Sequence, residues 1–165
     1  LEGIFSGMPW IWVVLGGGLG SLLRFALQGR VQFAFQGVFP LGTLAVNLVG
    51  SALIGMLAAF FASTSMSASL AAQGRAFLMV GVLGGFTTFS SYSLENLNLL
   101  RAGEWRMALL YVLSSNVLGV LLATAGYLVI RSIFARSNGI GGNVIERSAG
   151  LNSARSVSPS TWGCS

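Results

Sequence analysis

The amino-acid sequence predicts an all-α membrane protein with four transmembrane helices. The chain has 165 residues, of which 54% are hydrophobic and only 8% are charged, whereas soluble domains usually carry about 25% charged residues. A bilayer is crossed by about 20 consecutive apolar residues. Four apolar runs of suitable length follow one another, at about residues 9–27, 41–61, 76–100 and 107–130. Together they form one predicted membrane domain, residues 1–134.

Residue types and charge exclude several other classes of protein. The sequence has nine arginines and four glutamates, but no lysine, aspartate or histidine. A Cys/His metal site and a histidine-based catalytic triad are therefore excluded, and the single cysteine, Cys164, cannot form a disulfide within the chain. The net charge of +5 does not indicate a nucleic-acid-binding protein, because the arginines are scattered along the chain and mostly flank the apolar runs. Charges beside membrane spans explain them better.

The first run, residues 9–27, begins with Trp10 and Trp12, which are typical of an interfacial anchor. Its glycine-rich stretch lacks the last glycine of a dinucleotide-binding motif and follows no strand. Gly16 and Gly20 instead favour a close contact between helices. Arg24 lies near the end of the run, where it either snorkels to the interface or has a structural or functional partner. Residues 28–40 are predicted to be a short connection.

The second run, residues 41–61, carries no charge, and Asn47 is its one strongly polar residue. Thr43 is four residues earlier and shares a helix face with Asn47. An asparagine in hydrocarbon is costly unless it is paired or faces a wet cavity. Both a hydrogen bond between helices and a pore-lining role remain open for it. Ser51 and Gly55 form a second small-residue contact pattern. A Ser/Ala-rich loop, residues 63–74, is expected next.

The third run, residues 76–100, is predicted to be a broken helix. Three glycines fall within five residues, and each costs about 1 kcal/mol of helix stability relative to alanine. Two threonines and three serines follow within seven residues, and their hydroxyls compete for backbone hydrogen bonds. A break at Gly84–Thr88 survives in a membrane only where protein, water or an ion satisfies the freed backbone groups. The segment Gly84–Ser93 is therefore the predicted functional centre.

Three further side chains of this run are candidate functional groups. Phe89 and Tyr92 are three residues apart and face the same way on a helix. Such a pair is usually packing, but the many neighbouring hydroxyls favour a lining role. Glu95 lies about one turn beyond Tyr92, and a carboxylate within a membrane is a candidate functional group.

The last run, residues 107–130, is uncharged and has a polar patch at Ser114, Ser115 and Asn116. Residues 135–165 are polar and without periodicity, and they are predicted to be a disordered tail without chemistry.

Basic residues near the span ends are evenly divided between the two sides of the membrane. Four spans place both termini on one side, and the excess of basic residues sets the orientation. Here the two sides carry three arginines each: Arg30, Arg101 and Arg106 against Arg75, Arg131 and Arg136. The balance scarcely specifies a direction, and a protein that inserts in both orientations and pairs antiparallel would show this pattern.

Two motifs carry a resemblance to a known family. The stretches Gly42-Thr-Leu-x-Val-Asn47-Leu-Val-Gly50 and Gly84-Gly-Phe-Thr-Thr-Phe-Ser-Ser-Tyr-Ser-x-Glu95, together with Arg24, resemble the Fluc/CrcB family of fluoride channels. The similarity covers about residues 15–131. It implies an antiparallel homodimer with two pores, a central structural Na⁺, and passive export of toxic fluoride across a prokaryotic inner membrane. An enzyme is not expected either, because Glu95 is the only candidate general base in the membrane region.

The resemblance also implies roles for individual residues. Gly84 and Thr87 would bind Na⁺ through backbone carbonyls. Phe89 and Tyr92 would be the pore-facing aromatic pair, although the family's second aromatic is usually Phe. The remaining pore residues would be Asn47, Thr43, Thr88, Ser90 and a serine of the last span, either Ser115 or Ser114. Neutral donors of this kind can replace the water around a small anion without holding it too tightly.

Two other functions are compatible with part of the sequence. A proton-coupled small multidrug transporter also has four short spans and dual topology, and Glu95 would be its membrane carboxylate. That class usually carries the glutamate in its first span, where this chain has Arg24. A membrane subunit that only packs against a partner needs neither a broken helix nor a row of hydroxyls.

Overall fold

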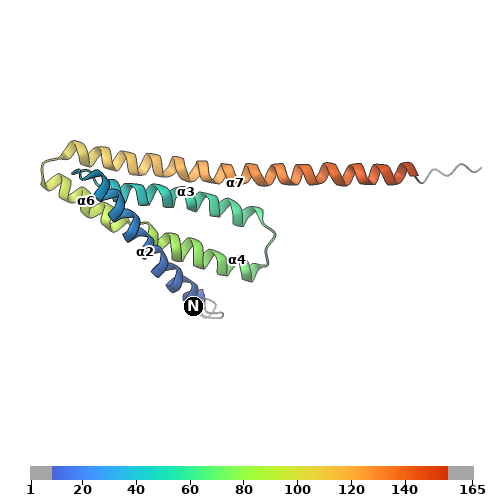
Figure 1. The fold of residues 1–165 in the computed structure, drawn as a ribbon, viewed down its shortest axis with the longest axis horizontal. Helices are drawn as coiled ribbons and strands as arrows, with labels where there is room; N and C mark the ends of the chain where they lie inside the picture. The colour runs from blue at the N-terminus through green and yellow to red at the C-terminus, as the bar shows by residue number, and fades with distance from the viewer. Residues whose placement is uncertain (1–8, 156–165) are drawn as a thin grey trace, which may run out of the picture.

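The chain folds into long helices. The computed structural model describes residues 9–155, with side-chain surroundings for residues 9–137. Within these residues every element is helical, and the third long element is composite (Figure 1). The elements are α2 (Pro9–Phe35), α3 (Leu41–Ser63), α4 (Ala68–Gly74), the π-helix η1 (Arg75–Leu83), α5 (Gly84–Phe86), α6 (Phe89–Arg101) and α7 (Trp105–Arg155).

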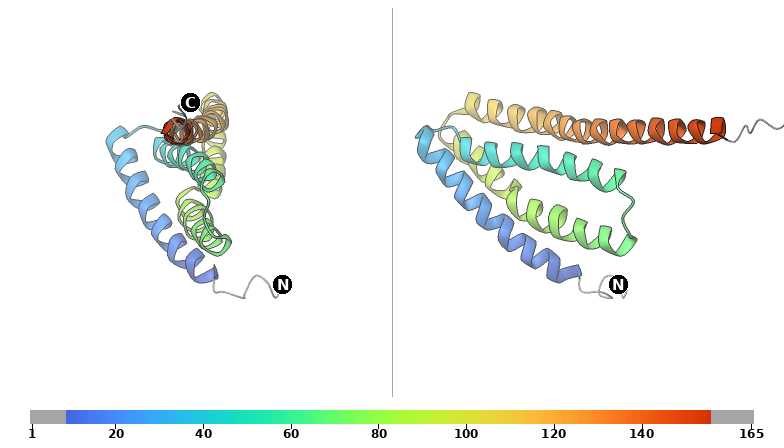
Figure 2. Two further views of the ribbon diagram at one scale, coloured as in Figure 1. Left: turned by 90° about the vertical axis from the view of Figure 1, so that its right-hand side faces the viewer. Right: turned by 45° about the vertical axis from the view of Figure 1, so that its right-hand side comes forward.

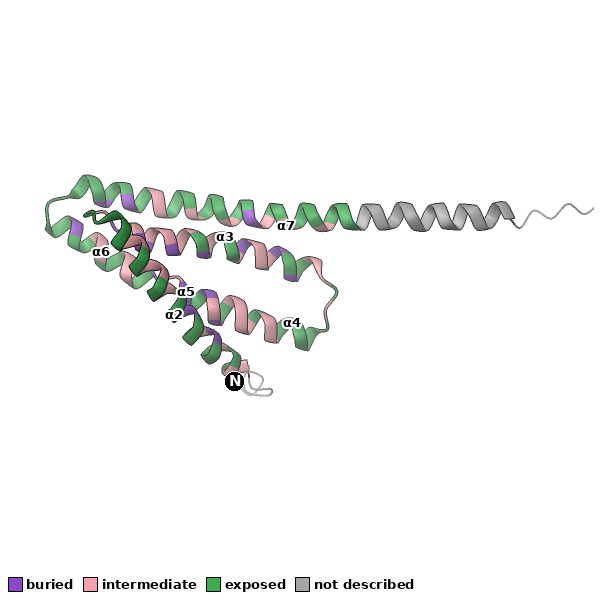
Figure 3. Cartoon of the chain, in the orientation of Figure 1, coloured by how far each residue is buried: buried purple, intermediate pink, exposed green. Residues whose placement is uncertain are grey.

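Four helical segments are long and apolar enough to cross a membrane: Pro9–Phe35, Leu41–Ser63, Ala68–Arg101 and Trp105–Ser137. Most of their large apolar side chains are exposed in the single chain, which suits a surface covered by lipid or by another subunit (Figure 3). The all-α fold with four membrane-spanning helices, the third of them broken, is therefore confirmed.

Several helix ends differ from those expected. The predicted connection after Leu27 is helical to Phe35, because Gly29 alone does not stop a helix and the stronger breakers, Gly37 and Pro40, come later. Part of the expected loop at residues 63–74 forms α4, which Ser67 caps by accepting a hydrogen bond from the Leu70 N–H at 3.4 Å.

The last helix is also longer than its predicted span. α7 continues to Arg155 and so enters the segment predicted to be a disordered tail. Residues 156–165 of that segment lie outside the described residues, and the prediction for them stays a prediction.

Small residues hold the helices close together, as the sequence indicated. α2 packs along η1 and α5, and α3 packs along α7 (Figure 2). A methyl group added at Gly16 or Gly20 would meet backbone atoms of Phe77 or Val82 in the third span. A methyl group at Gly55 would meet the backbone of Ala123 in α7. Both predicted small-residue contacts are therefore confirmed: the first brings the third span against α2, and the second brings α7 against α3.

Candidate functional site

The break in the third span lies at Thr87 and Thr88. Thr87 has φ −76° and ψ 154°, and Thr88 has φ −146° and ψ 113°, so both are extended. α5 ends immediately before them and α6 begins immediately after. The preceding η1 is a π-helix, a form that is rare and often found near functional sites. The break predicted at Gly84–Thr88 is thus where the chain leaves the helix.

Asn47 of α3 binds the backbone at the break. The Thr88 N–H donates to Asn47 Oδ1 at 2.9 Å, and Asn47 Nδ2 donates to the Thr88 carbonyl at 3.2 Å. The hydrogen bond between helices that the sequence left open is therefore present, and it satisfies both backbone groups of Thr88. One N–H of the Asn47 amide is not used in these two bonds.

Two carbonyls at the break lose their helical partners. In a continuous helix, the carbonyls of Gly84 and Thr87 would accept from the N–H groups of Thr88 and Ser91, four residues on. Those N–H groups donate instead to Asn47 Oδ1 and to Thr88 Oγ1, the latter at 3.2 Å. The Gly84 and Thr87 carbonyl oxygens are therefore released as acceptors.

Hydroxyl groups gather around Thr88. Its side chain is buried, and its Oγ1 lies 3.1 Å from Ser91 Oγ and 3.3 Å from Ser90 Oγ. Ser90 itself is exposed. The Thr87 hydroxyl has a different role, because it donates to the Leu83 carbonyl at 2.9 Å and stays on its own helix.

The aromatic pair shares one face of α6, as its spacing predicted. The ring centroids of Phe89 and Tyr92 are 5.5 Å apart, and Tyr92 lies 5.1 Å from the ring of Tyr111. Phe89 is 78% exposed, so its ring projects away from its own chain. The Tyr92 hydroxyl accepts a hydrogen bond from Asn116 Nδ2 at 3.2 Å.

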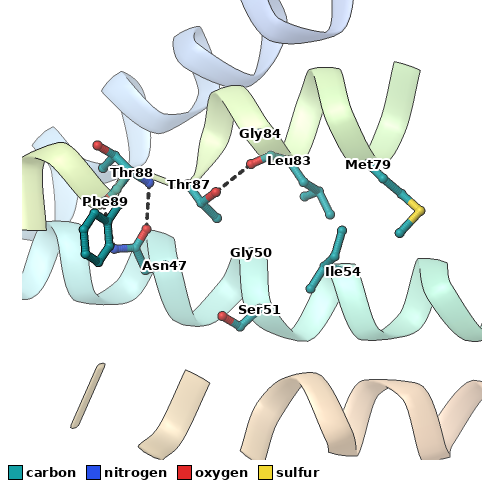
Figure 4. A pocket seen from close by; sticks show the side chains of 10 residues that line it. All are labelled: Asn47, Gly50, Ser51, Ile54, Met79, Leu83, Gly84, Thr87, Thr88 and Phe89. Carbon is teal, nitrogen blue, oxygen red and sulfur yellow. Dashed lines mark hydrogen bonds between the residues drawn. The ribbon is translucent and has the colours of Figure 1, made fainter. Parts of the chain in front are cut away.

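An open hollow of about 370 Å³ adjoins the break. Figure 4 shows α3 and the third span facing each other across it, with Asn47 bonded to Thr88 beside Phe89. The hollow is lined by Asn47, Gly50, Ser51, Ile54, Met79, Leu83, Gly84, Thr87, Thr88 and Phe89. It opens on the surface of the single chain, where lipid or a second subunit would cover it.

Glu95 lies at a second polar centre. Thr43 Oγ1 donates to its Oε1 at 2.6 Å, and the Tyr111 hydroxyl donates to its Oε2 at 2.7 Å. Gln28 Nε2 donates in turn to Thr43 Oγ1 at 3.0 Å. Thr43 and Asn47 therefore share a face of α3 but bind different parts of the third span.

Sequence reasoning missed two residues of this centre. Tyr111 stands four residues before Ser115 on the last span, and this spacing could have marked it. Gln28 falls in the predicted connection because the end of the apolar run places the end of the first helix too early.

The other candidate residues are placed as follows. The Ser115 hydroxyl is buried with no hydrogen-bond partner among the described residues, whereas Ser114 bonds the carbonyls of Leu110 and Tyr111 in its own helix. Ser115 is therefore the serine with an available hydroxyl. Arg24 is half-buried on α2 and makes no hydrogen bond to a described residue. The described residues contain no cluster of three or more acidic, His or Cys side chains that could hold a metal.

The fold and the site define a small multi-pass helical membrane protein whose third span is broken beside a largely apolar hollow that also exposes hydroxyl and amide groups. Broken spans of this kind occur where a protein surrounds a polar or ionic path. The model of the family described as "CrcB-like protein, Camphor Resistance (CrcB)" matches residues 11–127, which is most of the chain. The protein belongs to the CrcB family.

Similar proteins carry a common name. The chain is 51% identical to the "Fluoride-specific ion channel FluC" of one strain of Thermus thermophilus, covering 72% of this chain and 90% of the relative. Proteins of the same name from Opitutus terrae and Aquifex aeolicus are 48% and 47% identical, covering 89% and 95% of their own lengths. These relatives are named as channels and not as enzymes, and the chain is a multi-pass membrane protein of a prokaryotic family.

Proposed function

We propose that the protein is a channel through which toxic fluoride leaves a prokaryotic cell passively across the inner membrane. The observation that carries this proposal is the break at Thr87–Thr88, where hydroxyls, an amide and an outward-facing phenyl ring meet at an open hollow. The names of the relatives identify fluoride as the ion to test.

The groups at the break suit a small anion. Fluoride holds its water tightly, so a pore needs hydrogen-bond donors to replace that water. The Ser90 hydroxyl and the unused N–H of Asn47 can donate, and the positive edge of the Phe89 ring can face an anion. All of these groups are neutral, and neutral groups bind an anion weakly enough for it to leave.

A structural Na⁺ fits the backbone at the break. The carbonyls of Gly84 and Thr87 have lost their helical donors, and oxygen atoms are the ligands that a hard cation takes. Each chain would supply two such oxygens. The cation would supply positive charge between the chains, which offsets part of the cost of holding an anion in a low-dielectric membrane.

An antiparallel homodimer would cover the break. Gly84 and Phe89 are exposed in one chain, and lipid offers no partner for free backbone carbonyls at this depth. The same surface of a second copy of the chain is the simplest partner that could cover the break. The even division of the flanking arginines, three against three, supports the two orientations that such a pair requires.

Fluoride efflux from liposomes tests the proposal. Purified protein is reconstituted in vesicles loaded with KF, and a fluoride electrode records release after the membrane potential is set with valinomycin. We expect uncoupled efflux of fluoride that is much faster than efflux of chloride, and a lower rate when Na⁺ is replaced on both sides. Absence of fluoride efflux, or proton-coupled uptake of organic cations instead, would overturn the proposal in favour of the subunit or transporter alternatives.

The Na⁺ assignment is tested separately. We expect efflux to be independent of a Na⁺ gradient once Na⁺ is saturating on both sides, because a structural ion is not transported. Efflux that scales with that gradient would mean cotransport and would overturn the assignment.

A further inference from the structure

All four spans meet in one chain of hydrogen bonds. Gln28 of α2 donates to Thr43 of α3 at 3.0 Å, and Thr43 donates to Glu95 of α6 at 2.6 Å. Tyr111 of α7 donates to the other oxygen of the same carboxylate at 2.7 Å. Thr43 and Tyr111 are 1% and 0% exposed, so the centre of this network is shielded within the chain.

The chemistry of the groups fixes the direction of this chain. An ionised carboxylate only accepts hydrogen bonds, and a threonine hydroxyl has one hydrogen to give. Because that hydrogen lies on the 2.6 Å contact with Glu95, the Thr43 oxygen can only accept from its other neighbour. An amide NH₂ at Gln28 supplies that hydrogen, whereas a carboxylate at the same place could not.

The network holds the carboxylate beside a second hollow. This hollow has a volume of about 330 Å³, and Glu95 lines it together with Val38, Pro40, Asn98, Leu99 and Ala102. A carboxylate at such a site repels an anion, and hydroxyls bonded to both of its oxygens offset part of its charge. An anion that entered this hollow would therefore meet less repulsion while Thr43 points its hydrogen at Glu95.

We propose that Gln28 is a positioning residue for fluoride passage, which acts through Thr43 to keep the charge of Glu95 bonded to hydroxyls. This inference rests on the proposed function, since it concerns the passage of the same anion. Gln28 need not touch fluoride. Its contribution is to fix the direction in which the Thr43 hydrogen points. This role differs from merely linking α2 to α3 by a hydrogen bond.

Two substitutions at the same position separate these roles. Gln28→Glu keeps the size and shape of the side chain but replaces the donor by an acceptor, so the Thr43 hydrogen is drawn away from Glu95. Gln28→Leu removes the donor but leaves Thr43 free to donate to Glu95. We expect Gln28→Glu to lower the rate of fluoride efflux by about tenfold and Gln28→Leu by less than about threefold. A structural tie between α2 and α3 is lost in both variants, so it predicts that Gln28→Leu also lowers efflux by more than about threefold.

Efflux is measured from about pH 6 to about pH 9, so that any part of the loss that requires an ionised carboxyl at position 28 is seen to grow as the pH rises. Gln32→Glu is the matched control, because it adds the same charge one turn along α2, where Gln32 bonds the backbone of Gly37 and Gly42. We expect that control to stay within about twofold of the unmodified protein.

A reciprocal exchange gives a second test. In the double variant Gln28→Glu with Glu95→Gln, an amide at position 95 donates to Thr43 and Thr43 donates to the carboxylate at position 28. The chain of hydrogen bonds is restored in the opposite direction, and the total charge equals that of the unmodified protein. We expect its efflux and its thermal stability in detergent to exceed those of Gln28→Glu alone.

The outcomes distinguish this inference from the proposed function. If the unmodified protein carries no fluoride, the proposed function fails. If it carries fluoride but Gln28→Leu is as harmful as Gln28→Glu, or the double variant is no better than Gln28→Glu, only the role of Gln28 is overturned.

Discussion

At the scale of single residues, Asn47 shows how one amide can replace a helical hydrogen-bond pattern. It satisfies the N–H and the carbonyl of Thr88, at 2.9 and 3.2 Å, where the third span leaves the helix. A buried backbone group without a partner costs about 1 to 3 kcal/mol, and the cost is greater in lipid. The extended conformation of Thr88 is therefore tolerated because α3 carries an asparagine opposite it.

Replacing this amide should destabilise the protein strongly. Asn47→Leu leaves two backbone groups of Thr88 unsatisfied, and we expect a clear fall in the melting temperature in detergent together with loss of fluoride efflux. Asn116→Leu is the matched control, since Asn116 bonds only the Tyr92 hydroxyl and its own helix. Equal melting temperatures for the two variants would contradict the role given to Asn47.

The Phe89 ring offers a second prediction at this scale. It is 78% exposed and lies 5.5 Å from Tyr92, where a ring edge can meet an anion. Phe89→Ile keeps an apolar side chain but removes the ring, so we expect efflux to fall by about tenfold or more with the folded protein intact. Leu94→Ile, at another exposed position of α6, should leave the rate close to that of the unmodified protein. Undiminished efflux from Phe89→Ile would remove Phe89 from the pathway.

Tyr92 should be more tolerant than Phe89. Tyr92→Phe removes only the hydroxyl that accepts from Asn116 and keeps the ring beside Tyr111. We expect a change in efflux of less than about threefold, measured in the same liposome assay. A larger loss would mean that the hydroxyl itself contributes to the pathway.

Much of the candidate site follows from the sequence, because polar residues are conspicuous in apolar spans. Asn47, Thr88 and Glu95 could be selected for that reason alone, and the structure places Asn47 against Thr88. The partners of Glu95 could not be found in this way. They depend on how far α7 is shifted along α6 and on where α2 ends, and both are set by tertiary packing.

At the scale of the elements, close contacts with α2 and with α3 hold the broken third span in place. The third span meets α2 through glycines on both sides and meets α3 at Asn47. The helices and the break were evident in the sequence from apolar runs and glycine content. Helix ends were less evident, because in α2 the stronger breakers, Gly37 and Pro40, come well after the apolar run weakens, and α7 continues through the glycine pair at residues 141–142.

The contact between α2 and the third span should depend on one face of α2. Gly20→Ala places a methyl group against the backbone of Val82, whereas a methyl group at Gly18 meets nothing within 4 Å. Both changes raise intrinsic helix propensity by about 1 kcal/mol. We therefore expect Gly18→Ala to be neutral or stabilising and Gly20→Ala to lower the melting temperature. A comparable shift in both variants would show that the α2 contact does not hold the break.

At the scale of the whole molecule, the flanking arginines should leave the orientation undecided. With three arginines on each side, we expect reporter fusions at Arg136 to be found on both sides of the membrane. Lysines added to the connection at residues 64–67 should drive nearly all copies one way and abolish fluoride efflux. Co-expression of a copy biased the other way should restore it. A fusion of the unmodified protein on one side only would contradict the antiparallel pair.

The bond between Asn47 and Thr88 also bears on how the protein is made. α3 leaves the ribosome before the third span, so the amide that the break needs is in place when Thr88 arrives at the translocon. A polypeptide beginning at Ala68 lacks it, and its unsatisfied backbone would hinder stable insertion. We expect this fragment to be degraded in cells unless residues 9–63 are expressed beside it, and the rescue to fail when that partner carries Asn47→Leu. The span that supplies the amide thus precedes, along the chain, the span that needs it.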